Sequence, residues 1–185
     1  MKESDLPSID NILSFNYFSV KLVEGNIVSC VSDSLERASE ITDRAQLRKD
    51  VIYLKMAEVW SERSHCQRHK VGCLIVKDKS IISDGYNGSP HGFPNVCEDE
   101  ENKTLPYVLH AEANAITKLA KSTLSSVDST MYVTLSPCYE CSKLIIQSGV
   151  KRLVIKELYR KLDSLPFLLQ AGVEITRIGI IDPTI

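Results

Sequence analysis

Four residues of the sequence have the types and the spacing that a catalytic zinc site requires: His110, Glu112, Cys138 and Cys141. One imidazole and two thiolates are good zinc ligands, and three protein ligands leave the fourth tetrahedral position open for a water molecule. Cys138 and Cys141 are close enough in sequence to reach one ion from the same helical turn. Glu112 follows His110 closely, so its carboxylate can move protons beside a metal-activated water.

Each half of this pattern is weak by itself, because a single Cys-x-x-Cys also occurs as a redox pair or as half of a structural zinc knuckle. The sequence contains no second Cys-x-x-Cys and no thioredoxin-like beginning. Both halves stand at the expected starts of helices, where the helix dipole and free N–H groups favour thiolate over thiol. We therefore predict a catalytic zinc, and keep a structural zinc and a metal-free pair as the alternatives.

Composition limits the classes to which the protein can belong. The chain has 185 residues, 43% of them hydrophobic and 25% charged, which suits one compact globular unit. Its 22 basic and 24 acidic residues give a net charge of −2, which does not favour a nucleic-acid partner. The polar start resembles no secretory signal, and no apolar run approaches the ~20 residues of a membrane helix. We expect a cytoplasmic protein without a membrane partner, in which the six cysteines are metal ligands or free thiols.

The elements that must position these residues alternate regularly from about residue 46. We predict helices over 46–63, 110–121, 138–148 and 165–172, and strands over 71–76, 80–86, 131–135, 150–157 and 173–181. Residues 87–106 are rich in glycine and proline and form a long loop. Alternating strands and helices favour a sheet that is covered on both faces. We therefore predict an α/β fold, a three-layer α/β/α sandwich around a five-stranded mixed sheet, over a domain of residues 46–185.

Residues 1–45 differ from this pattern and carry no chemical motif. They contain a possible hairpin, with strands over 18–23 and 26–31, and then a helical stretch over 34–44. We interpret the segment as an N-terminal extension of unknown role, either structural or an oligomer contact.

The chemical motif has a known relative: H-x-E…P-C-x-x-C is the signature of zinc nucleobase deaminases. Between about Leu54 and Gly179 the chain resembles the cytidine deaminase superfamily, and within it the dCMP deaminase family. The resemblance rests on KVGCLIV (70–76), GYNGSPHG (85–92), HAEANAI (110–116) and MYVTLSPCYECSKLIIQSGVKRLV (131–154). It implies a cytidine deaminase-like fold, and hydrolysis of dCMP to dUMP and ammonia by a zinc-activated water, which supplies dUMP for thymidylate synthesis.

The resemblance also assigns substrate-binding roles to matching positions. It implies that Asn87 contacts the sugar, Ala111 and Glu112 the base, and the backbone at Ser136 and Pro137 the amino group, and that Tyr159 helps to place the nucleotide. The 5′ phosphate is expected at Ser64, Arg68 and Lys70, since arginine suits bidentate and lysine point-charge phosphate contacts. A solvated basic turn is the alternative for these three residues.

Further properties of the family bear on this chain. Some members hold a second, structural zinc, for which Cys66 and Cys97 are the matching residues, and His65, His69, His91 and the acids at 98–101 are potential further ligands. Buried or free thiols are the alternative. Many members respond to dCTP and dTTP with magnesium through the loop that here contains Gly88, Ser89, Pro90, His91 and Gly92, and a hexamer is typical. A deaminase for tRNA adenosine, guanine or single-stranded DNA, or an inactive regulatory homologue, stays open as an alternative.

Overall fold

The computed structural model describes residues 10–24, 26–34, 38 and 43–179. Helices and strands alternate along most of this range, as the sequence predicted for residues after 46. The elements are α1 (Asp10–Leu13), β1 (Tyr17–Val23), β2 (Asn26–Ser32), α3 (Arg44–Ser61), β3 (Gly72–Lys77), β4 (Ser80–Tyr86), α4 (Ala111–Leu119), β5 (Thr130–Leu135), α5 (Tyr139–Gln147), β6 (Arg152–Glu157), α6 (Ser164–Gln170) and β7 (Glu174–Ile178).

The sheet is mixed, as predicted, but it has seven strands in the order β2-β1-β7-β6-β5-β3-β4. Strands β5, β6 and β7 are parallel, and β3 runs antiparallel to both β4 and β5. The prediction of five strands was wrong because the N-terminal hairpin joins this sheet. Strand β1 pairs antiparallel with β7, where Tyr17 lies opposite Ile178. An edge strand has unpaired backbone groups, which β1 satisfies. The helix predicted over 34–44 lies largely outside the described residues.

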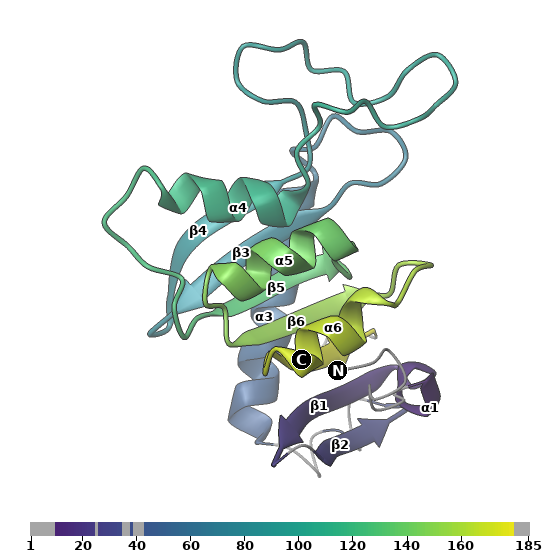
Figure 1. The fold of residues 1–185 in the computed structure, drawn as a ribbon, viewed down its shortest axis with the longest axis vertical. Helices are drawn as coiled ribbons and strands as arrows, with labels where there is room; N and C mark the ends of the chain where they lie inside the picture. The colour runs from purple at the N-terminus through teal and green to yellow at the C-terminus, as the bar shows by residue number, and fades with distance from the viewer. Residues whose placement is uncertain (1–9, 25, 35–37, 39–42, 180–185) are drawn as a thin grey trace.

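Helices cover both faces of the sheet (Figure 1). Side chains alternate between these faces along the strands. Leu74, Tyr132 and Val154 pack in one core with the buried face of α3, and their neighbours in sequence pack in a second core with α4, α5 and α6. This two-sided burial explains the continuous apolar runs of β3, β5 and β6. Within the part of the chain that the structure describes, no helix is long and apolar enough to cross a membrane.

A buried ion pair fastens α3 to its face of the sheet. Asp50 of α3 is 2% exposed, and Arg152 of β6 donates to both of its carboxylate oxygens, at 3.0 and 2.7 Å. The Tyr132 hydroxyl donates to the same carboxylate at 2.8 Å. A buried charge with this many partners is satisfied, so the pair fixes the position of α3.

Helix α4 is held close against β4, which sets the position of its first turn. A Cβ at Gly85 would lie 2.1 Å from the Ala111 carbonyl oxygen, so only glycine allows this approach. The Ser83 hydroxyl donates to the Ala115 carbonyl at 2.6 Å, and the Asn114 amide donates to the Tyr86 carbonyl at 2.9 Å. The connection between β4 and α4 projects beyond the sheet (Figure 1).

Candidate zinc centre and substrate pocket

The predicted zinc ligands meet where α4 and α5 begin. His110 is the N-cap residue of α4 and Cys138 the N-cap residue of α5, and Cys141 lies in the first turn of α5. His110 Nδ1 lies 3.4 Å from the Sγ of Cys138 and 3.4 Å from that of Cys141. Zinc bonds of ordinary length at tetrahedral angles place a nitrogen and a sulfur ligand about 3.6 Å apart. The donor set therefore fits a zinc ion in type and in spacing.

The two thiols of this set titrate very differently. The Cys138 pKa is lowered to about 3, chiefly because the Cys141 side chain donates a hydrogen bond to it and also because of His110. The Cys141 pKa is raised, first by the same hydrogen bond and then by burial. The hydrogen bond that His110 donates to the Cys138 sulfur raises the His110 pKa. The three groups thus share protons that a bound cation displaces, as metal binding to thiols requires.

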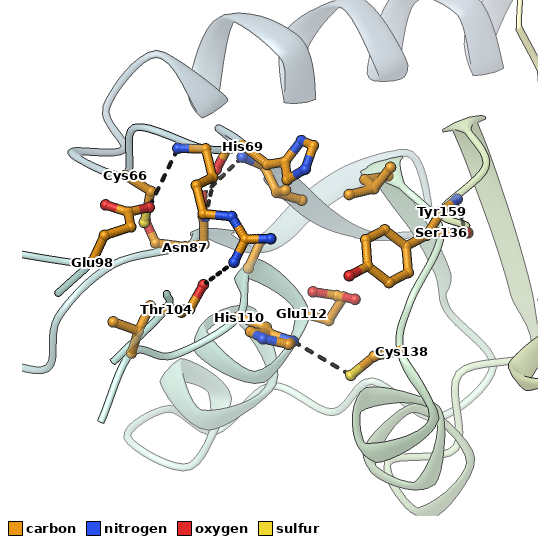
Figure 2. A pocket seen from close by; sticks show the side chains of 15 residues that line it. Cys66, His69, Asn87, Glu98, Thr104, His110, Glu112, Ser136, Cys138 and Tyr159 are labelled. Carbon is orange, nitrogen blue, oxygen red and sulfur yellow. Dashed lines mark hydrogen bonds between the residues drawn. The ribbon is translucent and has the colours of Figure 1, made fainter. Parts of the chain in front are cut away.

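Glu112 occupies the first turn of α4, beside the ligands. Its side chain is only 3% exposed, and burial is the main cause that raises the pKa of its carboxyl above the ordinary value. A bound divalent cation acts in the opposite direction by favouring the carboxylate. Figure 2 shows the carboxyl group between His110 and the Tyr159 hydroxyl, facing the pocket. A carboxyl group balanced in this way can both accept and donate a proton.

Two of the ligands, His110 and Cys138, line a cavity of about 150 Å³ together with Glu112. In Figure 2, Glu98 and Thr104 lie on one side of this pocket and Cys138 on the other, with His110 and Glu112 between them. The lining residues come from segments that are far apart in the sequence, so the fold itself creates the cavity. They are Cys66, Arg68, His69, Val71, Asn87, Glu98, Thr104, Val108, His110, Ala111, Glu112, Leu135, Ser136, Cys138 and Tyr159.

Five of the residues to which the resemblance assigned substrate contacts, besides Glu112, line the cavity. They are Arg68, Asn87, Ala111, Ser136 and Tyr159. The Asn87 amide already accepts from the Val71 N–H at 2.8 Å and donates to the His69 carbonyl at 2.7 Å. One proton and one lone pair of this amide stay free for a ligand. The Ser136 hydroxyl accepts from the Tyr159 N–H at 2.7 Å, which holds Tyr159 at the cavity.

The other three residues lie outside the cavity lining. Ser64 is buried, and its hydroxyl donates to the Asn87 carbonyl at 2.8 Å. Lys70 lines a second, smaller cavity with Lys156. Pro137 is buried, and its carbonyl accepts from the Ser164 hydroxyl at 2.8 Å. In this structure Ser64 and Pro137 shape the site through backbone contacts, and their direct substrate contacts, like that of Lys70, stay predictions.

Sequence reasoning missed a group of pocket residues, most of which lie in the connections before β3 and after β4, with one at the end of β5. His69 and Glu98 were considered only as metal ligands, and Thr104, Val71, Val108 and Leu135 were not considered. Glu98 and Thr104 face each other as an isolated antiparallel bridge inside the long loop. A hairpin this short has no periodic pattern, and its turn signals are few: Asp99, whose carboxylate accepts the Glu101 and Lys103 N–H groups, and Asn102, which has a φ of 59°.

Within the part of the chain that the structure describes, the predicted second zinc site forms no metal-binding cluster, and the predicted effector loop does not line the main cavity. Cys66 and Cys97 are buried, and burial is the main cause that raises the Cys97 pKa to about 12, with the neighbouring Cys66 thiol as a second cause. Among the described residues, the only histidine, cysteine and carboxylate group close enough to hold an ion is the His110 set. Residues 88–92 do not line the main cavity. Both assignments stay predictions.

Comparisons with known proteins agree with this site. The profile of the cytidine and deoxycytidylate deaminase zinc-binding region matches residues 47–157. A probable deoxycytidylate deaminase of Caenorhabditis elegans is 42% identical over 127 residues, which are 65% of this chain and 64% of the worm protein. The deoxycytidylate deaminase of Mycobacterium phage D29 is 37% identical over 57% of this chain and 91% of its own length.

A solved structure resembles the fold as well as the sequence. The crystal structure of dCMP deaminase from the cyanophage S-TIM5, in complex with dCMP and dUMP, has a TM-score of 0.67 and 47% sequence identity. The match covers 68% of this chain and 93% of the phage chain. The chain therefore belongs to the cytidine and deoxycytidylate deaminase family, and its cofactor is zinc.

Proposed function

We propose that this protein hydrolyses dCMP to dUMP and ammonia. The observation that carries the proposal is the His110, Cys138 and Cys141 set beside the buried Glu112 carboxyl group, at a cavity that His110, Cys138 and Glu112 line. The deoxycytidylate deaminases among its relatives, and the dCMP and dUMP bound to the similar phage enzyme, support this substrate. The finer assignments of residues to parts of the nucleotide belong to the same proposal.

The chain supplies the proton transfers of this reaction through Glu112. His110, Cys138 and Cys141 would hold the zinc ion, which would lower the pKa of a bound water molecule and so supply a nucleophile at neutral pH. Glu112 accepts the proton that this water loses and delivers it to the ring nitrogen next to the amino-bearing carbon. It then takes the proton of the hydroxyl group added to that carbon and gives it to the amino group, which leaves as ammonia while the oxygen becomes the carbonyl oxygen of dUMP. Burial keeps this carboxyl group away from bulk solvent.

The remaining lining residues hold and orient the nucleotide. The first turn of α4 at Ala111 and the backbone at Ser136 bind the base edge and the amino group, with Tyr159 beside them. The free donor and acceptor of the Asn87 amide contact the sugar. The Arg68 guanidinium binds the 5′ phosphate, since its planar fork suits phosphate oxygens.

The biological setting follows from the same activity. Its product is the precursor of thymidylate, and we expect it to form in the cytoplasm. Residues 88–92 adjoin Asn87 and are at least partly exposed, which suits binding of dCTP or dTTP with magnesium. A homo-oligomer, hexameric in the family, completes the proposal.

Ammonia release tests the proposed function directly. The purified zinc protein is incubated with dCMP, dCTP, deoxycytidine or adenosine. The incubations with dCMP, deoxycytidine and adenosine are repeated with dCTP or dTTP added as an effector. We expect turnover of dCMP to exceed that of the other substrates. Faster release from adenosine or deoxycytidine would assign the enzyme to another deaminase substrate, and no release from any of them would indicate an inactive homologue.

A further inference from the structure

The long connection between β4 and α4 contains a small hairpin, residues 97–105, that borders the cavity. Its arms are joined by the Glu98–Thr104 bridge and by the hydrogen bond from the Leu105 N–H to the Cys97 carbonyl at 2.8 Å. Its tip is fixed by Asp99, whose carboxylate accepts two backbone N–H groups, and by Asn102, which has a φ of 59°. An internally bonded hairpin of this kind can act as a firm support for a neighbouring segment.

The hairpin supports residues 66–68, the segment that carries Arg68. The Glu98 carboxylate accepts from the Gln67 N–H at 3.1 and 3.2 Å and from the Arg68 N–H at 3.3 Å. Thr104, on the opposite arm, accepts from Nη1 of Arg68 at 3.3 Å. Cys97, at the base of the hairpin, neighbours Cys66, and both thiols are buried. Backbone and guanidinium of Arg68 are therefore both held by the hairpin.

The charges at the contact between the hairpin and residues 66–68 leave the Arg68 guanidinium available to an anionic ligand. Although Glu98 and Arg68 line the same cavity, the carboxylate binds backbone N–H groups, and no ion pair joins it to the guanidinium. Indeed, within the described ranges no carboxylate lies within 4.0 Å of the Arg68 guanidinium nitrogens. An arginine whose backbone and head group are both held loses less conformational freedom when it binds an anion.

We propose that Glu98 and Thr104 are positioning residues that set the affinity of the enzyme for the 5′ phosphate of its substrate by holding Arg68 at the cavity. The inference rests on the proposed function, because it takes Arg68 as the phosphate contact. It predicts that damage to the hairpin weakens the binding of nucleotides but not of nucleosides. If Glu98 acted only through its charge, removal of its carboxylate would relieve repulsion of a phosphate and strengthen the binding of nucleotides.

The test compares dUMP and deoxyuridine, two ligands that differ only in the phosphate, as competitive inhibitors of dCMP turnover. In Glu98→Ala we expect the KM for dCMP and the Ki of dUMP to rise about tenfold, as loss of hydrogen bonds to a charged group implies. The kcat and the Ki of deoxyuridine should stay within about twofold. Thr104→Val should raise the Ki of dUMP about threefold, and Thr104→Ser, which keeps the hydroxyl, should restore it.

Glu100→Gln is the matched control, because Glu100 is an exposed acid of the same hairpin that does not line the cavity. It should leave all four constants unchanged. Equal increases for dUMP and deoxyuridine, tighter binding of dUMP by Glu98→Ala, or an equal effect of Glu100→Gln would overturn the proposal. If Glu98→Ala does not fold, Thr104→Val and Thr104→Ser decide the question. The quantity compared is again the change in the Ki of dUMP relative to the change in the Ki of deoxyuridine. Failure of the wild-type protein to release ammonia from dCMP would instead refute the proposed function.

Discussion

The two sides of the cavity each contain a pair of cysteines, but they differ in chemistry. At the zinc side, Cys138 and Cys141 stand at a helix start beside His110, and the Cys138 pKa is lowered to about 3. At the hairpin side, Cys66 and Cys97 are buried, no third ligand joins them among the residues that the structure describes, and the Cys97 pKa is raised to about 12. A pair of thiols therefore becomes a metal site through its neighbours, and spacing by itself does not decide the matter.

The strongest test of this contrast removes one thiol from each pair. We expect Cys141→Ala to lose tightly bound zinc and all measurable turnover, because two ligands do not retain the ion. Cys97→Ala, the matched control, should keep zinc and wild-type-like turnover. Elemental analysis of the purified proteins measures the zinc content, with one ion per wild-type chain expected. Two zinc ions per wild-type chain, reduced to one in Cys97→Ala, would instead support the predicted second zinc site at Cys66 and Cys97.

A second test separates proton transfer from metal binding within the zinc side. Glu112→Gln removes the proton carrier but keeps the size of the side chain, so zinc should remain while kcat falls roughly a thousandfold. Glu140→Gln is the control, since Glu140 is an exposed acid in the first turn of α5 that pairs with Lys143. Wild-type-like turnover in Glu112→Gln would exclude its role as the proton carrier.

A third test addresses the hairpin side, where we expect binding rather than chemistry to change. Arg68→Ala should raise the KM for dCMP about tenfold and leave the KM for deoxycytidine nearly unchanged, since only dCMP carries a phosphate. Arg63→Ala is the control, because Arg63 is exposed, packs over the Trp60 and Tyr86 rings and does not line the cavity. Equal changes for both substrates would remove Arg68 from the phosphate site.

The same contrast explains which features the sequence could predict. His110, Glu112, Cys138 and Cys141 were predictable as a group because zinc chemistry restricts residue types, and helix starts restrict spacing. Helices and strands after residue 46 were predictable from apolar periodicity. The contact of Glu98 with the Gln67 and Arg68 N–H groups was not, because any segment offers backbone donors. Nor could apolar patterning show that β1 pairs with β7, since that choice depends on which sheet edge is free.

The smallest expected effect concerns the buried thiol of Cys97 at high pH. Its pKa is raised in the folded protein from 9.0 to about 12, so folding favours the protonated thiol. The resulting stability is complete below about pH 9 and is lost as pH rises towards 12. We expect the denaturation midpoint of the wild-type protein, measured with reductant, to fall between these values, and to fall less in Cys97→Ala. Cys73 is also buried, and burial is the main cause that raises its pKa. Part of the fall in the denaturation midpoint with rising pH should therefore remain in Cys97→Ala. An identical dependence of the denaturation midpoint on pH in both proteins would mean that Cys97 ionises as readily in the folded chain as in the unfolded one. The raised Cys97 pKa, and with it the contrast with Cys138, would then be wrong.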